Sequence, residues 1–123
     1  MCFFSHRNIS SIKIIIDRQY NMEVHLGTKL KLNLHIEKFE DLSMSDYDFS
    51  VDIYTPRGNN KIIYSKDNLI KIDDDNYVFL VDTSIIGLGR IYVKIIAKIP
   101  DYDFEEKVRE EIQVINSGIV VID

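Results

Sequence analysis

The chain has 123 residues, a formal net charge of −5 and 46% hydrophobic residues, which predicts one domain with its own core and excludes a disordered chain. The single cysteine, Cys2, excludes an internal disulfide, and no apolar run reaches the roughly 18 residues of a membrane helix. Residues 1–4 are too short for the core of a signal peptide, and the acidic balance predicts neither a nucleic-acid nor a membrane partner.

The composition favours β-structure throughout. The chain contains 21 Ile, 9 Val and 7 Tyr but only one alanine, Ala97. β-Branched and aromatic side chains suit a pleated, half-buried surface, whereas alanine is the best helix former. We therefore expect an all-β fold, an antiparallel β-sandwich of Ig-like or jelly-roll-like type with about 7–9 short strands. Residues 20–123 are expected to form this single sandwich domain.

Residues 1–19 differ from the rest of the chain. They contain the apolar residues Ile12 and Ile14–Ile16, but the flanking residues are irregular. We expect an N-terminal arm or an edge strand that pairs with a neighbour. An unpaired apolar arm would be an aggregation hazard in a free monomer, which favours a chain that works in an assembly.

An unbroken alternation of apolar and polar residues follows in residues 29–36. Every second side chain of a strand points to one face, so the core face is expected to hold Leu30, Leu32, Leu34 and Ile36. Residues 20–26 alternate in a similar way, and Gly27–Thr28 fits a two-residue type II′ turn. The sequence therefore predicts a β-hairpin over residues 20–36.

The middle of the chain predicts several short strands with clear turns between them. Strands are expected at residues 49–54, 61–65, 68–72 and 77–81, with a loop at residues 56–60 and a turn at residues 73–76. The turn follows from Asp73, Asp74, Asp75 and Asn76, whose side chains hydrogen-bond their own backbone.

The last third of the chain predicts the longest strand, at residues 90–99, after a loose Gly87–Gly89 segment. Its core face is expected to hold Ile91, Val93, Ile95, Ala97 and Ile99, with Ile96 as an apolar exception on the other face. Pro100 ends this strand because it lacks an N–H donor. Two further strands are expected at residues 111–115 and 119–122, with a helix at residues 108–111 as a minor alternative.

No histidine or acidic cluster has the spacing of a metal site. Across the expected turn, His25 would lie near Lys29 or Lys31 and far from His35, so a shared metal is not expected, and His6 stands alone. The run Asp73–Asp75 lacks the calcium-loop spacing and its distal Glu. The alternating acids Asp101, Asp103 and Glu105 are better explained as a solvated loop.

No motif predicts catalysis. Gly87–Gly89 precedes a strand, whereas a phosphate cradle needs a helix N-terminus, and Cys2 has no partner that would activate it. The tyrosines are candidates for a sugar- or partner-binding surface, although tyrosine is also common in ordinary strands; they are Tyr47, Tyr54, Tyr64, Tyr77, Tyr92 and Tyr102. We expect a protein that is not an enzyme, with no catalytic, cofactor-binding or metal residue and no cofactor.

Four segments resemble motifs of one group of proteins. Residues 46–54 (DYDFSVDIY) are similar to a D-Y-D-F-x-V-x-F-Y strand, and residues 81–90 (VDTSIIGLGR) to a V-D-T-S-x-L-G-x-G-x corner. Residues 97–104 (AKIPDYDF) resemble an A-x-I-P-D-x-D-F strand end, and residues 109–119 an R-x-E-V … T-G-I ending. These motifs occur in small β-sandwich proteins encoded by tailed phages of gut Bacteroidales, including crAss-like phages.

The resemblance covers residues 20–122 and implies a virion structural protein. Its members occur as head-fibre, capsid-decorating or tail and baseplate parts. One departure is that Glu105–Lys107 stands where the family often has Pro-Asp-Gly. We therefore expect a capsid-surface decoration or head-fibre anchoring protein, in the virion after assembly in the host bacterial cytoplasm. Its expected partners are other virion proteins and further copies of itself. The alternatives are a tail or baseplate adaptor and a carbohydrate-binding or adhesin module.

Overall fold

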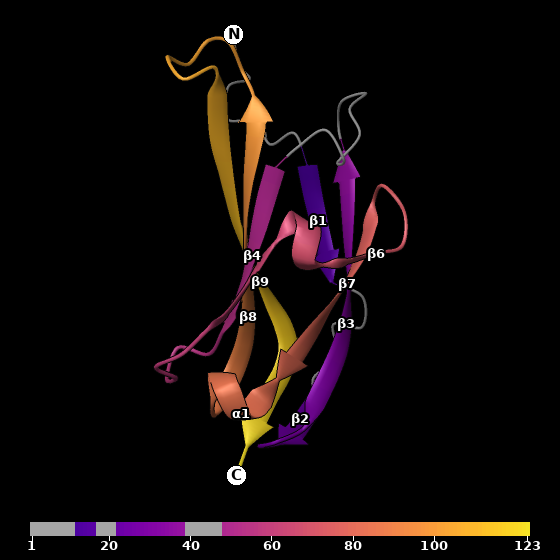
Figure 1. Ribbon diagram of the computed structural model, residues 1–123. Coiled ribbons are helices and arrows are strands. Elements are labelled where there is room, and N and C mark those ends of the chain that lie inside the picture. Colours follow the sequence, from indigo (N-terminus) through magenta and orange to yellow (C-terminus); the bar gives the residue numbers. More distant parts are fainter. Residues whose placement is uncertain (1–11, 17–21, 39–47) are drawn as a thin grey trace, which may run out of the picture.

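A computed structural model describes residues 12–16, 22–38 and 48–123 (Figure 1). The described residues form nine strands, a 3₁₀ turn at Lys66–Asn68 and the short helix α1 (Thr83–Ile86). The strands are β1 (Ile12–Ile16), β2 (Met22–His25), β3 (Lys29–Lys38), β4 (Asp48–Tyr54), β5 (Ile62–Ser65), β6 (Ile70–Lys71), β7 (Asn76–Asp82), β8 (Gly89–Pro100) and β9 (Val108–Ile122). No helix in these ranges has the length and apolar character needed to span a bilayer.

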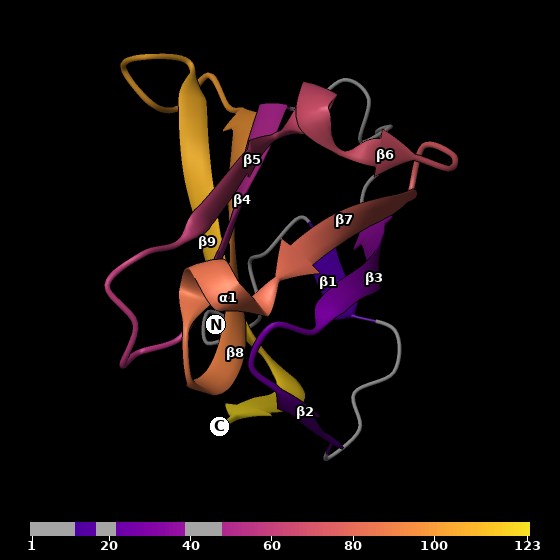
Figure 2. The ribbon, with the colours of Figure 1, turned by 60° about the horizontal axis from the view of Figure 1, so that its bottom comes forward.

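The strands form two sheets, which confirms the predicted all-β sandwich. One sheet has the order β1-β3-β7-β6 and the other the order β2-β9-β8-β4-β5. All neighbours pair antiparallel except β2 and β9, which run parallel. We letter β1 as A and β3 to β9 as B, C, C′, D, E, F and G. The sheets then read ABED and GFCC′, as in an immunoglobulin-like sandwich, with β2 as an added edge strand beside G. Figure 2 shows α1 beside the end of β7 and close to β8, at one end of the sandwich.

The core lies between the sheets, and the side chains predicted for the core face of β8 are buried in it. Ile91, Val93, Ile95 and Ala97 are fully buried, and Ile99 is 2% exposed. The four-stranded sheet contributes Leu34 and Ile36, both fully buried, so the alternation of residues 29–36 is also confirmed. The rings of Phe49 and Tyr77 meet edge to face, with centroids 5.3 Å apart, and so join the two sheets.

The predicted hairpin over residues 20–36 is wrong. A turn is present, because the Thr28 amide donates to the His25 carbonyl at 3.0 Å. However, β2 pairs with β9 in one sheet, whereas β3 pairs with β1 and β7 in the other. Gly27, at φ +99°, lies where the chain crosses between sheets. Alternation alone fits either set of partners, so contacts distant in the sequence decide the pairing.

Thr83 is the residue that holds this crossing. Its hydroxyl accepts from the Gly27 amide at 2.9 Å and donates to the Thr28 carbonyl at 2.8 Å. Its own amide donates to the same carbonyl at 3.2 Å. Because Thr83 is fully buried, these bonds satisfy polar groups that would otherwise be costly to remove from water.

The strands predicted at residues 111–115 and 119–122 are parts of the single strand β9, so their separation is wrong. The register of β8 and β9 shifts between Arg90 and Tyr92, opposite Ser117 and Gly118. Gly118 has φ +82°, and the buried Ser117 hydroxyl donates to the Ile91 carbonyl at 2.8 Å. The apparent break is therefore a β-bulge, which accommodates extra residues without ending the strand.

Two other predictions about this region are also wrong. Residues 108–111 lie in β9 and are not helical. β9 has 15 residues and β8 has 12, so the strand predicted at residues 90–99 is not the longest. The expected strands at 49–54, 61–65 and 77–81 are confirmed by β4, β5 and β7, and the one at 68–72 by the shorter β6.

The N-terminal segment is described only in part. Ile12–Ile16 forms β1, an edge strand that pairs antiparallel with β3. The rest of residues 1–19, which includes Cys2 and His6, lies outside the described residues, as does Tyr47.

Candidate functional site

The outer face of the five-stranded sheet carries side chains in rows that cross its strands. Residues directly opposite each other on neighbouring strands have Cβ atoms about 5 Å apart, so the members of a row lie side by side. The strand registers give these rows in order along the sheet: Tyr54, Tyr92 and Asn116; Ile63, Asp52, Lys94 and Val114; Ser65, Ser50, Ile96 and Ile112; Asp48, Lys98 and Glu110.

Three neighbouring apolar side chains on β8 and β9 form what we call the apolar strip: Ile96, Ile112 and Val114. Ile96 and Ile112 are directly opposite each other. Ile112 is 55% exposed and Val114 is 54% exposed. β-Branched side chains of this size are usually found in the core, so their exposure in a cluster marks a surface suited to contact with another molecule.

Beside the strip, a shallow cavity opens between β4, β8 and the loop from β4 to β5. Its volume is about 410 Å³, and we call it the Asp52 pocket. It is lined by Asp52, Tyr54, Thr55, Pro56, Gly58, Asn59, Asn60, Lys61 and Lys94. Asp52 is only 7% exposed, and its Oδ2 lies 3.4 Å from the Nζ of Lys61. The pocket therefore has a nearly buried carboxylate at its base.

The loop that forms one wall of this pocket is fixed to α1. The buried Thr55 hydroxyl donates to the Ile86 carbonyl at 2.8 Å and accepts from the Gly58 amide at 3.1 Å. A Cβ added to Gly58 would overlap the Ile86 carbonyl oxygen and stand 2.8 Å from the Thr55 Oγ1. Only glycine allows this close approach, so the loop and α1 meet in one fixed arrangement.

Two tyrosines form the row that borders the pocket. The rings of Tyr54 and Tyr92 stack with centroids 5.9 Å apart and an angle of 26° between their planes. They lie directly opposite each other on β4 and β8, and each ring limits the rotation of the other. Tyr54 also lines the pocket, which therefore has one aromatic wall.

The β8–β9 hairpin rises beyond the neighbouring strands at the top of Figure 1. Near its end, Arg109 binds Asp101 at 2.9 Å and also binds Glu111. Burial opposes the guanidinium charge, but the hydrogen bonds to Glu111 and Asp101 outweigh it and raise the pKa of Arg109. An open groove of about 830 Å³ runs beside these residues. These ion pairs give Arg109 a structural role, because they hold the two ends of the hairpin loop together at its base.

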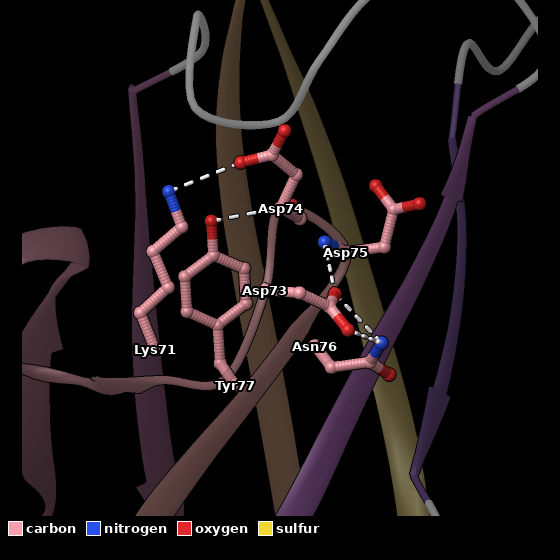
Figure 3. A network of polar contacts seen from close by, with 6 residues as sticks. All are labelled: Lys71, Asp73, Asp74, Asp75, Asn76 and Tyr77. Atoms are coloured by element: carbon pink, nitrogen blue, oxygen red, sulfur yellow. Dashed lines mark hydrogen bonds and ion pairs between the residues drawn. The ribbon is translucent and has the colours of Figure 1, made fainter.

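The acidic run at Asp73–Asp75 forms the turn predicted for it (Figure 3). The Asp75 amide and the Asn76 side chain donate to the Asp73 carboxylate, and these bonds lower the pKa of Asp73. Asp74 pairs with Lys71 at 3.1 Å, which raises the pKa of that lysine. The Asp73 carboxylate thus bonds within the turn and the Asp74 carboxylate pairs with Lys71 just before it. No group of three metal-ligating side chains gathers anywhere in the described ranges.

The other residues singled out in the sequence do not come together. His35 Nδ1 lies 2.7 Å from the Asn76 side-chain oxygen, whereas His25 lies opposite Ile122 in the other sheet, so its predicted place near Lys29 or Lys31 is wrong. Asp101 turns back to Arg109, and Asp103 donates its amide to Asp101.

The tyrosines do not share one surface either. Tyr77 is buried, and the Tyr64 hydroxyl donates to the Leu80 carbonyl. Tyr102 is 81% exposed on the hairpin loop. Among the tyrosines that the structure describes, only Tyr54 and Tyr92 stack on each other. Sequence reasoning missed Asp52 and Lys94, because an isolated acid and an isolated lysine on two strands carry no spacing signal.

No protein-family model matches the chain, and no curated protein matches it either. Among solved structures, the chain is similar to a DUF4785 family protein from Legionella pneumophila subsp. pneumophila str. Philadelphia 1, with a TM-score of 0.55 and 13% sequence identity. The match covers 93% of this chain and 30% of that protein's chain. At this identity the likeness concerns the fold alone.

Proposed function

We propose that this chain is a non-catalytic structural subunit of a tailed-phage particle, which acts by protein–protein contact as a capsid-surface decoration or head-fibre anchoring protein. The observation that supports a contact role is the apolar strip, in which Ile112 and Val114 leave more than half of their surface exposed. The phage setting is supported by the motifs of residues 20–122 that resemble phage virion proteins.

The occupant that we propose for the apolar strip is the same face of a second copy of this chain. The charges around the strip have both signs, with Lys94 and Lys98 beside Asp52 and Glu110. A face with both signs can offer counter-ions to itself, whereas a strongly charged partner would favour a single sign. Particles also repeat their subunits, so weak contacts between copies gain from multivalency.

The test of the contact is the oligomeric state of the full chain over a range of concentrations. We expect Ile112→Ser to weaken self-association at least tenfold, because burying an isoleucine contributes about 2 kcal/mol and tenfold is about 1.4 kcal/mol. Ile72→Ser is the matched control, since Ile72 is 63% exposed and lies outside the strip, and it should leave association unchanged. A wild-type chain that stays monomeric at every concentration would contradict the proposed contact.

The test of the setting is separate. Particles purified from the strain that carries the gene are separated into heads and tails and analysed by peptide mass spectrometry. We expect this chain in the head fraction, in many copies. Its presence in the tail fraction would replace the decoration role by a tail or baseplate role, and its absence from particles would contradict the virion assignment.

A further inference from the structure

The walls of the Asp52 pocket are held by contacts within the chain. Thr55 and Gly58 fix its loop to the Ile86 carbonyl, and the stacked pair Tyr54 and Tyr92 fixes its aromatic wall. Its volume of about 410 Å³ lies within the range of about 300–1,000 Å³ that is usual for small-molecule sites. A preorganised site loses little entropy when a ligand binds, so even a small ligand can be held.

The polar groups of the pocket suit a ligand with several hydroxyl groups. The Asp52 carboxylate accepts hydrogen bonds, and the exposed amides of Asn59 and Asn60 both donate and accept them. A hydroxyl group is also both donor and acceptor, so it can bridge an amide and a carboxylate. The Tyr54 ring adds an apolar surface beside these groups, as the apolar face of a sugar ring requires.

The charge of the pocket selects among such ligands. Two lysines, Lys61 and Lys94, line it against one carboxylate, whereas the chain as a whole has a net charge of −5. Lys61 is paired with Asp52. Lys94 is half-buried on β8 and forms no ion pair with any described residue. A second anion, supplied by a ligand, would be the natural counter-ion of Lys94.

We propose that the Asp52 pocket binds an acidic saccharide of the hexuronic acid class. The ligand's carboxylate pairs with the Lys94 ammonium, its hydroxyls bond to Asn59, Asn60 and the Asp52 carboxylate, and its ring lies beside Tyr54. This inference goes beyond the proposed structural role. The pocket shares Asp52 and Lys94 with the charged border of the apolar strip, so the two proposals are separated by a variant whose change lies outside the pocket. A subunit that docks through the strip would carry a weak sugar site next to the contact.

The test titrates the full chain with two sugars that differ in one group, methyl β-D-glucuronide and methyl β-D-glucoside. Binding is followed by NMR at the side-chain amides of Asn59 and Asn60, which line the pocket. We expect the glucuronide to bind at least tenfold more tightly than the glucoside, because only the glucuronide supplies a carboxylate for Lys94.

Two variants localise the effect. Lys94→Gln should weaken glucuronide binding about tenfold and abolish the preference over the glucoside. Lys98→Gln is the matched control, because Lys98 faces the same side of β8 but does not line the pocket, and it should leave binding unchanged. Equal losses in both variants would indicate general charge attraction and overturn the proposal.

Two further outcomes would also overturn it. Titration with inorganic phosphate alone tests for a plain anion site. If phosphate binds as tightly as the glucuronide, the pocket recognises an anion and not a sugar. If neither sugar shifts the amide signals of Asn59 and Asn60, the pocket does not bind these sugars. Repeating the titration on the Ile112→Ser variant separates this result from self-association, since that change lies outside the pocket.

Discussion

Two loops of the five-stranded sheet are built in opposite ways. The loop from β4 to β5 is bonded to the interior, because the hydroxyl of Thr55, which is 2% exposed, donates to the Ile86 carbonyl. The loop from β8 to β9 is closed mainly by its own backbone, with the Asp101 amide donating to the Lys107 carbonyl at 3.0 Å. It also leaves Tyr102 81% exposed.

This difference indicates which loop can hold a ligand in a fixed geometry. The β4–β5 loop shares its position with α1 and the core, so its asparagines are presented in one arrangement. The β8–β9 loop can change without disturbing the core, because its bonds stay between residues 101 and 111. Variants in the two loops should therefore differ in their effect on stability.

The largest effect is expected for Gly58→Ala. The new methyl group would overlap the Ile86 carbonyl oxygen, so we expect a loss of about 3 kcal/mol in the free energy of unfolding. Gly27→Ala is the control: its methyl group meets open space, and its φ of +99° alone costs about 1 kcal/mol. Urea unfolding measures both, and equal losses would show that the β4–β5 loop is not held tightly.

A smaller effect of opposite sign is expected for Lys107→Gly in the other loop. Lys107 has φ +61°, a left-handed conformation that glycine adopts without the steric cost of a Cβ. We expect a gain of up to about 1 kcal/mol, measured by the same urea titrations. Lys107→Ala keeps the Cβ and should give no gain, so a similar gain in both variants would contradict this explanation.

The smallest effect is expected at Asp82, which caps α1 and so supports the helix that holds the β4–β5 loop. The Ser84 side chain and backbone amide donate to Asp82 and lower its pKa below the ordinary value of 3.8. Because the pKa of Asp82 is lower in the folded chain, its ionised carboxyl stabilises the fold at pH values above the ordinary pKa. This stability is lost as the pH falls through the pKa of the folded chain. Asp82→Ala should thus lower the Tm slightly at pH 7.

The Tm difference between the wild type and Asp82→Ala should shrink as the pH falls through the lowered pKa of Asp82, because protonation removes the charge that strengthens the bonds to Ser84. Asp82→Asn serves as its control, because it keeps an acceptor for Ser84 without titrating. Thermal unfolding between pH 2 and pH 7 measures the three proteins. A Tm difference between wild type and Asp82→Ala that stays constant over this range would contradict the role of the ionised cap.

Local sequence patterns predict which side chains of a strand are buried, but they do not predict which strands pair with each other. The alternation around Ile91 predicts the buried face of β8, because side-chain direction follows from strand geometry alone. The turn at Gly27–Thr28 was also visible, but the hydroxyl of Thr83 that fixes the crossing lies far along the chain. The gap between the strands predicted at residues 111–115 and 119–122 contains Gly118, and local patterns do not distinguish a bulge there from a turn, because both use the same residue types.

The candidate site could be predicted only in part, for a similar reason. The sequence shows Ile96 as an apolar residue on the otherwise polar face of its strand, and in the structure Ile96 is part of the apolar strip. Ile112 joins it only through the register of β9 against β8. Likewise Tyr54 was singled out as a tyrosine, but its stacking on Tyr92 and the position of Lys94 follow from the register of β4 against β8. Registers between distant strands are not encoded in local patterns.

The parallel pairing of β2 with β9 also has a consequence for the order of folding. Met22 meets Ile119, roughly a hundred residues further along the chain, and such distant contacts slow the folding of β-proteins. During synthesis, β3, β4 and β7 emerge well before β9, so the segment containing β2 has no partner strand until residues 119–122 have been made. A ribosome-bound chain that stops before residue 119 should therefore leave β2 accessible to proteases and chaperones.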